Sequence, residues 1–385
     1  MRVLFAVDGL WVGGTERSLV ELLPLMGTTG IETQVACLRG RSGEGIEEAA
    51  RAAGAHLRIL EASSFLGQVR ALRRIAREWQ PAILHSALFQ ANLVARFAAI
   101  GLPLVLLNSV VNTPYERARY EDPDVRKARL RAVQALDAVT GRWLVDHFHA
   151  VSAAAGTAAA RALRVPTERI TVVHRGRDAR RLGARTAERR VRVRQGLGVP
   201  NDAELVVSVG RQDYQKGQSV LVAAVGRLVP RRPSIRLLVA GRSGNATPAL
   251  QATSERSGLG DRVRFLGHRE DVPDLLAAAD LFAFPSLFEG FPGAMIEAMA
   301  LGLPIVASDI PPVRELRGPA ANSLLVPPND PAALAEALAE LLDDSARAAA
   351  MGESGRARYE AHFTLEEAGA SMVALYRRLA GSRFT

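Results

Sequence analysis

Cysteine and aromatic residues are scarce in this sequence of 385 residues. The single cysteine, Cys37, excludes an intramolecular disulfide and is typical of a protein from a reducing compartment. Aromatic residues make up 5% of the chain, which is poor for stacking nucleic-acid bases, and the sequence contains no zinc-finger or RNA-recognition motif. We therefore expect no nucleic-acid partner.

Long hydrophobic runs are also absent. The first apolar run, VLFAV at 3–7, is shorter than the core of a signal peptide. No other run approaches the length of about 20 apolar residues that a membrane-spanning helix needs. The sequence therefore predicts a cytoplasmic protein.

Lysine is the third scarce residue. All but two of the 49 basic residues are arginine, the exceptions being Lys127 and Lys216, and the formal net charge is +9. A GC-rich genome would explain this bias, and an anionic partner is the functional alternative. The basic helices expected around 70–77 and 117–131 likewise have two interpretations. They are either solvated faces or surfaces that rest on the anionic inner face of the cell membrane.

What the sequence does contain is a regular alternation of short apolar runs with helix-length segments. Continuous β-branched runs of this kind are typical of buried parallel strands with helices on both faces of the sheet. The first series of runs lies at 3–7, 33–38, 56–60, 82–86, 103–110, 147–152 and 170–174. After an arginine-rich connection at 175–203, the second series lies at 204–210, 235–241, 263–267, 281–285, 304–308 and 323–328.

This pattern predicts two tandem doubly wound α/β domains, at 1–180 and 181–363, whose sheets face a cleft. Three helices are expected to end the chain. The last of them, at about 364–385, is expected to pack back on the first domain. Ligands of open α/β sheets bind beyond the carboxyl ends of the strands, so the cleft is the expected position of the site.

The stretch SLFEGFPGAMIEAMALGLP, at 286–304, places two glutamates in an apolar strand–loop–helix segment. Glu289 lies in the loop, and Glu297 lies about one turn into a helix that begins at Pro292-Gly293. Alone, each has a plain interpretation, as a solvated loop residue or as a partner of the helix dipole. Together they indicate a ligand site, because a buried carboxylate needs partners and a ribose diol supplies two adjacent donors. Amides expected to face ligand oxygens are those near Gly290, Phe291, Gly293 and Ala294.

Two cations follow the first strand of the second domain, in SVGRQDYQKG at 208–217. Arg211 ends the strand, and Lys216 lies in the loop that enters the next helix. At the carboxyl edge of the sheet, two fixed cations would stabilise negative charge on a ligand. The alternative is a pair of solvated loop cations.

These motifs together resemble the nucleotide-sugar glycosyltransferases of the large retaining group called family 4. The E-x7-E pattern of Glu289 and Glu297, the glycine-rich VGGTER at 12–17 and the G-R-x4-K-G loop at 210–217 carry the resemblance. LGLPIVASD at 301–309 and FTLEEAGASMVALY at 363–376 extend it over nearly the whole chain. The resemblance implies a GT-B fold, with two Rossmann-like domains.

The resemblance also implies an activity. It implies transfer of a hexose-type sugar, with retention and without a metal or cofactor, in polysaccharide or glycolipid synthesis. The donor would be UDP- or GDP-linked, and the acceptor a hydroxyl of a glycan or lipid-linked sugar. Retention is expected to involve front-face attack, in which the leaving phosphate takes the acceptor's proton. The sequence itself contains no H-E-x-x-H motif and no D-x-D in a loop beside these motifs.

Site roles follow from the resemblance position by position. Arg211, Lys216 and Glu289 are the expected catalytic residues, with Glu289 beside the donor sugar, and Glu297 binds the ribose. Gly14 is expected to lie against the donor's diphosphate or the acceptor. The remaining residues expected to bind the donor are Gly267, at the base-side wall, and Gly290, Phe291 and Gly293.

The sequence departs from the family pattern in two places. Many relatives carry a histidine after the fifth strand of the first domain, where this chain has LLNSVVNTPYER with Asn108 and Asn112. Either asparagine could hydrogen-bond a sugar hydroxyl, but neither is a useful base. His85 would contact the acceptor or serve as a structural histidine. Arg175 replaces an asparagine that relatives often carry near the domain connection.

Two alternatives remain within the same architecture: a sugar-nucleotide 2-epimerase, and a non-catalytic protein that binds nucleotide sugars. The first would turn over the donor without an acceptor, and the second would form no product. An NAD oxidoreductase is disfavoured because GLWVGG, at 9–14, does not match G-x-G-x-x-G.

Overall fold

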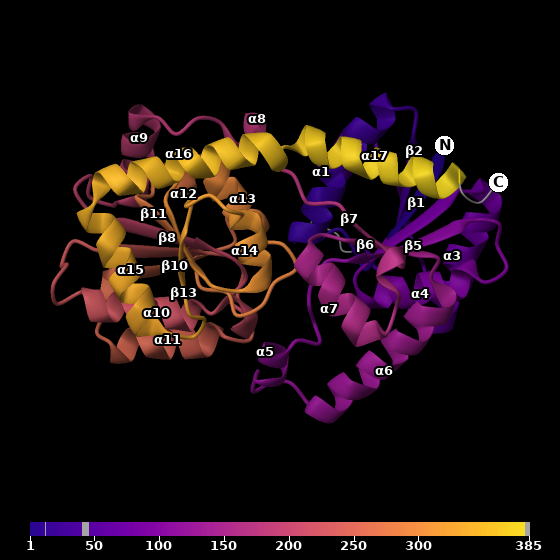
Figure 1. Cartoon of the computed structure of the whole chain (residues 1–385), viewed down its shortest axis with the longest axis horizontal. Coiled ribbons are helices and arrows are strands. Elements are labelled where there is room, and N and C mark those ends of the chain that lie inside the picture. Colours follow the sequence, from indigo (N-terminus) through magenta and orange to yellow (C-terminus); the bar gives the residue numbers. More distant parts are fainter. Residues whose placement is uncertain (12, 41–45, 382–385) are drawn as a thin grey trace. The chain divides into compact units, whose positions relative to one another are not determined.

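The chain forms two compact units, shown in Figure 1. The structure is a computed structural model and describes residues 1–11, 13–40 and 46–381. Unit 1 comprises Met1–Tyr115, Arg126–Arg177 and Leu365–Thr385, and unit 2 comprises Glu116–Val125 and Asp178–Thr364. The segment Glu116–Val125, which contains the short helix α5 (Arg117–Tyr120), groups with unit 2 although it lies between two segments of unit 1.

Unit 1 is built on a parallel sheet with the strand order β3-β2-β1-β4-β5-β6-β7. Its strands are β1 (Arg2–Val7), β2 (Glu32–Cys37), β3 (His56–Ile59), β4 (Ile83–Ala87), β5 (Val105–Val110), β6 (His147–Ala150) and β7 (Ile170–Val172). Its helices are α1 (Gly14–Thr28), α2 (Glu47–Ala52), α3 (Phe65–Trp79), α4 (Phe89–Ala99), α6 (Lys127–Leu144), α7 (Ala153–Leu163) and α17 (Leu365–Gly381). The seven predicted strands of the first series are confirmed.

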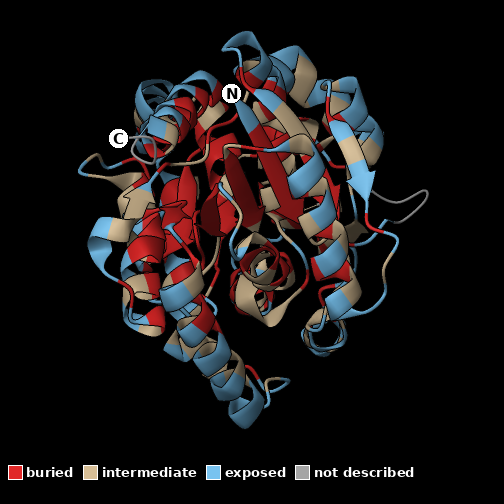
Figure 2. Ribbon diagram, turned by 90° about the vertical axis from the view of Figure 1, so that its right-hand side faces the viewer, coloured by how far each residue is buried: buried red, intermediate tan, exposed pale blue. Residues whose placement is uncertain are grey.

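Side chains of β1 alternate between two apolar cores. Val3, Phe5 and Val7 enter the core that also contains residues of α1 and α17, whereas Leu4 and Ala6 enter the core on the other face. Successive strand residues point to opposite faces, so a continuous apolar run is buried on both sides only when helices cover both. Figure 2 shows the resulting buried strands, in red, surrounded by helices with exposed outer sides.

Unit 2 repeats this architecture with the parallel order β10-β9-β8-β11-β12-β13. Its strands are β8 (Leu205–Val209), β9 (Arg236–Ala240), β10 (Val263–Gly267), β11 (Leu281–Phe284), β12 (Ile305–Ser308) and β13 (Leu324–Val326). Its longer helices are α9 (Ala187–Leu197), α10 (Gln218–Leu228), α11 (Thr247–Arg256), α13 (Gly293–Ala300), α15 (Pro331–Asp343) and α16 (Ser345–His362). The shorter helices are α8 (Ala179–Leu182), α12 (Val272–Ala278) and α14 (Pro311–Arg317). The predicted fold class, two doubly wound parallel sheets, is confirmed.

The C-terminal helix α17 packs on α1 within unit 1. Gly369 permits the close approach, because a Cβ at this position would lie 2.8 Å from the side chain of Leu25. Tyr376 of the same helix is fully buried. In the part of the chain that the structure describes, no helix is both long and apolar enough to cross a membrane.

The strand order reverses once in each sheet, and the loops at the reversal are where a ligand is expected. In unit 1 the reversal lies between β1 and β4, and in unit 2 it lies between β8 and β11. The glycine-rich loop follows β1, the loop with Arg211 and Lys216 follows β8, and the loop with Glu289 follows β11.

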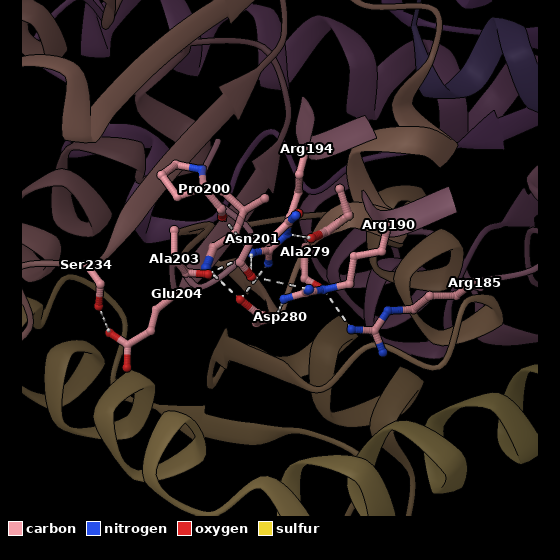
Figure 3. A network of polar contacts seen from close by, with 12 residues as sticks. Arg185, Arg190, Arg194, Pro200, Asn201, Ala203, Glu204, Ser234, Ala279 and Asp280 are labelled. Carbon is pink, nitrogen blue, oxygen red and sulfur yellow. Dashed lines mark hydrogen bonds and ion pairs between the residues drawn. The ribbon is translucent and has the colours of Figure 1, made fainter. Parts of the chain in front are cut away.

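A buried arginine network fixes α9 to the opposite, amino-terminal edge of the unit 2 sheet (Figure 3). Arg194 is fully buried and donates to the carbonyls of Ala203 (2.7 Å) and Ala278 (2.9 Å) and to the carboxylate of Asp280 (2.8 Å). Asp280 also accepts from Arg190 and from the amide of Leu205, each within 2.8 Å. Part of the arginine excess therefore holds the fold together.

Candidate functional site

The site residues of unit 2 lie in two loops that hydrogen bonds tie together. The amide of Leu287 donates to the carbonyl of Gln215 over 2.8 Å. The side chain of Gln215 in turn donates to the carbonyl of Phe288 over 2.8 Å. The loop after β8 and the loop after β11 are therefore fixed side by side at the point where the strand order reverses.

Lys216 and Glu289 form an ion pair across these two loops. The distance between Lys216 Nζ and Glu289 Oε1 is 2.6 Å, and the side chains are 23% and 8% exposed. The lysine stem crosses Gly210, where a Cβ would lie 3.3 Å from Lys216 Cδ, and Nζ lies 5.9 Å from the centre of the Phe284 ring. Partial burial strengthens such a charge pair relative to one in water. The sequence indicated both residues but not their contact.

Gly217 makes this arrangement possible. It adopts a φ of +58°, and a Cβ at this position would collide with the carbonyl oxygen of Pro285 in the neighbouring loop. Because the obstacle is backbone, it cannot rotate away, and a residue with a side chain would also be strained at this φ. Glycine here brings the chain directly after Lys216 into contact with the loop that carries Glu289.

Arg211 lies in the same loop but is more exposed, at 57% of its side chain. Its Nε atom lies 2.7 Å from Asp213 Oδ2. Asp213 Oδ1 accepts from the amide of Asn245 at 3.4 Å, so the aspartate links Arg211 to the segment after β9. The guanidinium is thus held near the carboxyl edge of the sheet and remains accessible to solvent.

Glu297 is paired with a different cation, Arg181. It lies on α13, which begins at Gly293 directly after Pro292, and it is buried. The distance from Glu297 Oε1 to Arg181 Nη2 on α8 is 3.3 Å. The buried carboxylate of Glu297 therefore has a partner within unit 2. The sequence offered no signal that singled out Arg181 among the arginines of 175–203.

The remaining donor-side residues occupy loop and helix starts of unit 2. Gly267 ends β10 with a φ of +66°, and its carbonyl accepts from the amide of Gly241 at 2.7 Å. Phe291 is buried, with its ring centre 5.5 Å from that of Phe363, so its side chain packs within unit 2. Gly290 and Phe291 both have interaction partners within the chain. Gly293 is partly exposed at the first position of α13.

Arg175, which follows β7, lies beside the glycine-rich loop of unit 1. Gly14 is exposed at the start of α1, and Arg175 Nη2 donates to the hydroxyl of Thr15 over 3.0 Å. A Cβ at Gly14 would lie 3.4 Å from Arg175 Nη1. The family departure at Arg175 therefore adds positive charge beside Gly14. Val12, the first residue of the VGGTER motif, lies outside the described residues.

Asn108, within β5, and Asn112, which follows it, differ in their burial. Asn108 is fully buried and accepts from Arg96 Nε (2.8 Å) while donating to Ser86 Oγ (2.7 Å). The expectation that Asn108 could bind a sugar hydroxyl is wrong, because the side chain is enclosed in this network. Asn112 is half-buried, and its Oδ1 accepts from the amide of Thr113 at 2.8 Å.

His85 belongs to a buried chain of hydrogen bonds that crosses three neighbouring strands. Its Nδ1 lies 2.6 Å from Tyr376 Oη, and its Nε2 lies 2.6 Å from Ser109 Oγ. Ser109 Oγ in turn lies 2.8 Å from His149 Nδ1, and His149 Nε2 lies 3.0 Å from the carbonyl oxygen of Val173. A carbonyl only accepts, so in the neutral chain His149 donates to Val173, Ser109 donates to His149, His85 donates to Ser109, and Tyr376 donates to His85.

Burial keeps this chain neutral. It lowers the pKa of His85 well below its ordinary value, with a smaller effect from His149, and lowers the pKa of His149 to about 4. Both ring nitrogens of His85 have partners within unit 1, which matches the structural alternative for this residue. His85 also lines a cavity of unit 1, together with Ser109, His149, Arg175 and Tyr376. Among the described residues, no three His, Cys, Asp or Glu side chains gather into a metal site.

Two family models match most of the chain. Residues 12–181 match the model described as Glycosyltransferase Family 4, and residues 190–358 match that described as Glycosyl transferases group 1. The lipopolysaccharide core biosynthesis mannosyltransferase LpsB of Rhizobium meliloti is 32% identical over 244 residues, which cover 62% of this chain and 68% of that protein. D-inositol 3-phosphate glycosyltransferase of Corynebacterium urealyticum is 35% identical over 219 residues, which cover 55% of this chain and only 51% of that protein.

Solved structures share the fold over nearly the full length. HepE of Anabaena, in complex with UDP and glucose, has a TM-score of 0.85 at 21% identity, covering 97% of this chain and 99% of that one. Sucrose-phosphate synthase from Thermosynechococcus elongatus has a TM-score of 0.83 at 22% identity, covering 99% and 100%. At such identities the likeness concerns the fold alone.

Proposed function

Because the chain belongs to the family 4 glycosyltransferases, we propose that it transfers a hexose-type sugar from a nucleotide-sugar donor to a hydroxyl acceptor, with retention and without a metal. The observation that carries this proposal is the Lys216–Glu289 pair at the strand reversal of unit 2. It joins a cation suited to a departing phosphate with a carboxylate suited to sugar hydroxyls.

The pair has a direct consequence for donor binding. Before the donor binds, Glu289 compensates the charge of Lys216. A diphosphate that approaches Lys216 would compete with this carboxylate for the ammonium, and Glu289 would turn to accept hydrogen bonds from the donor sugar. Arg211, in the same loop, supplies a second cation. As the glycosidic bond breaks, negative charge grows on the diphosphate, so these cations stabilise the transition state more than the ground state.

The ribose is proposed to bind at Glu297. Its carboxylate is buried and is held by Arg181, which fixes its orientation. The helix α13 begins one turn earlier, and its first turn favours negatively charged groups. Gly267, Gly290, Phe291 and Gly293 complete the proposed donor side, and Phe291 contributes through backbone because its side chain is packed inside.

Unit 1 is proposed to bind the acceptor. Gly14 with the neighbouring Arg175 would receive an anionic or hydroxyl-rich group, and Asn112 is the second acceptor-side residue. His85 would contribute to the acceptor side only as part of the wall of the cavity that it lines, because both of its ring nitrogens already have partners. The relatives support a cell-surface glycan or a lipid-linked sugar as acceptor, since LpsB is named for lipopolysaccharide core biosynthesis.

The donor class is tested by a thermal-shift panel of UDP- and GDP-linked sugars. HepE was solved with UDP and with UDP-glucose, which supports such donors. A ligand at 100 times its dissociation constant stabilises the folded state by about 2.7 kcal/mol. We expect the melting temperature to rise by roughly 5 °C or more with at least one donor, and the rise to disappear in Lys216→Ala.

The outcomes separate the alternatives. No shift with any donor, or an undiminished shift in Lys216→Ala, contradicts the proposed site. Conversion of a bound donor to its epimer without an acceptor would indicate a sugar-nucleotide epimerase. Binding with no product, and with full affinity in Glu289→Ala, would indicate a non-catalytic binding protein.

Arg181 is proposed as a positioning residue that acts through Glu297. Replacing it with alanine removes this ion pair from the Glu297 carboxylate, so we expect the KM for the donor to rise about tenfold, equivalent to about 1.4 kcal/mol, with kcat changing much less. Arg181→Lys should restore part of the loss. The matched control is Arg180→Ala, whose side chain is 83% exposed on the same helix. Equal KM values for the two alanine variants would remove Arg181 from this role.

A further inference from the structure

The helix α6 of unit 1 exposes an apolar stripe to solvent. Its three large members are Leu136, Val139 and Trp143, which are 43%, 61% and 75% exposed. The exposed apolar residues of α6, together called the α6 stripe, are Ala128, Ala132, Ala135, Leu136, Val139 and Trp143. They are separated by four, three, one, three and four positions, so they share one face of the helix.

The stripe is not a misplaced part of the core. The opposite side of α6 buries Asp137, Thr140 and Gly141 and packs on α4 and α7. There Arg96, itself 1% exposed, donates to Asp137 Oδ1 at 2.6 Å and to Thr140 Oγ1 at 2.8 Å. The helix is therefore held firmly in one rotation, and that rotation faces the stripe outward. In Figure 2, α6 is the lowest helix, and it is exposed along much of its outer side.

The exposed charged side chains of α6, which flank the stripe, are all positive. Within α6, all of whose residues are described, the exposed charged side chains are Lys127, Arg129, Arg131 and Arg142, and the one carboxylate is the buried Asp137. Their helical positions place Arg129 on one side of the stripe and the other three on the other side.

A shallow groove beside the stripe is also lined by both cationic and apolar side chains. Arg131, Arg142 and Arg164 line it together with Val139 and Trp143. The Arg142 guanidinium lies 5.6 Å from the centre of the Trp143 ring. Among the carboxylates near α6 or the groove, Asp124 accepts from the Asn245 side chain, Asp146 from the amide of Leu106, and Glu168 from the hydroxyl of Thr167.

We propose that the α6 stripe docks unit 1 on an anionic lipid bilayer, with the helix lying in the plane of the interface. An apolar face flanked on both sides by cations matches such a surface, because the apolar side chains enter the acyl region while the arginines reach the headgroups. Tryptophan suits this boundary because its ring is apolar and its N–H is polar. A bilayer with a negative surface also complements every exposed charge of the helix. The inference does not depend on the proposed transferase activity.

Binding to vesicles tests the proposal directly. The full chain is sedimented with vesicles of phosphatidylcholine alone, or with roughly one-third phosphatidylglycerol to supply negative charge. We expect binding to the anionic vesicles only, weakened by salt, and at least tenfold weaker in V139S/W143S. Both positions are highly exposed, so the folded state should be unaffected, and a matched melting temperature verifies this. The control L66S/I100S alters two exposed apolar residues of unit 1 outside the stripe and should bind normally.

Two further comparisons locate the contact. R131Q/R142Q should weaken binding, whereas R70Q/R74Q, on the exposed side of α3, should not. Brominated acyl chains should quench tryptophan emission in the wild type but not in Trp143→Phe. The proposal is overturned if V139S/W143S binds as the wild type does, if R70Q/R74Q is the weaker pair, or if anionic vesicles fail to bind. It is also overturned if the stripe variant instead abolishes self-association in sedimentation, which would assign the stripe to a second copy of the chain.

Discussion

Replacing Lys216 with alanine is expected to lower the turnover of the donor by roughly 10²–10³-fold, the usual loss when one preorganised donor to a developing negative charge is removed. Lys216 is partly buried and is fixed by the contact between its loop and the loop of Glu289. Its charge is therefore presented without reorganisation when the diphosphate leaves. Release of the nucleoside diphosphate, followed under saturating donor, measures the effect on kcat.

Two companion variants make this result specific. Arg256→Ala removes an exposed cation at the end of α11, at the opposite edge of the sheet, and should leave turnover unchanged. Lys216→Ala also removes the ammonium that faces buried Glu289, so its unfolding free energy must be measured beside its activity. If K216A/E289Q regains stability and still turns over more slowly than Glu289→Gln alone, the loss comes from the missing ammonium and not from misfolding. Turnover within a factor of three of the wild type in stable Lys216→Ala would contradict the assigned role.

Replacing Arg194 with methionine is expected to lower the free energy of unfolding by about 3–5 kcal/mol, the range for breaking a buried charge pair. The guanidinium is fully buried, and its hydrogen bonds connect α9 with the segment before β8 and with Asp280 before β11. Methionine fills part of the volume, but it leaves the carbonyls of Ala203 and Ala278 without this donor. Urea unfolding followed by circular dichroism measures the change.

Arg190→Met is the matched control. Arg190 contacts the same carboxylate, with Nη2 2.8 Å from Asp280 Oδ1, but its side chain is 28% exposed. Water can replace the lost interaction there, so the expected loss is about 1 kcal/mol or less. If the two variants lose the same free energy of unfolding, burial of the Arg194 network does not determine how much that network stabilises the fold.

The sequence predicted the strands of both sheets because buried parallel strands are continuous apolar runs, which are local signals. It also indicated Lys216, Glu289 and Glu297, because each lies in a loop or helix that follows a strand and in a motif that resembles family 4. It did not predict which charges would meet. Glu289 and Lys216 are 73 residues apart, and Glu297 and Arg181 are 116 residues apart. Pairing over such separations is set by strand order and loop contacts, which the sequence pattern leaves open.

The arginine excess shows the same limit. Genome bias and an anionic partner were the two explanations that composition offered, yet Arg96, Arg177 and Arg194 are among the largest fully buried side chains of the described chain. Their neutralising and hydrogen-bonding partners come from distant segments, as Asp137 does for Arg96. The role of His85 was equally hidden, because its partners Ser109, on β5, and Tyr376, on α17, come from distant parts of the sequence.

The central claim is that the two tied loops after β8 and β11 bind the diphosphate of a nucleotide sugar. Calorimetric titration of UDP and GDP into the wild type, Lys216→Ala and Glu289→Gln tests it most directly. We predict that at least one diphosphate binds the wild type, binds Lys216→Ala at least tenfold more weakly, and binds Glu289→Gln as well or better, because a competing carboxylate has been neutralised. Equal affinity in the wild type and Lys216→Ala, or no binding of either diphosphate, would contradict the account.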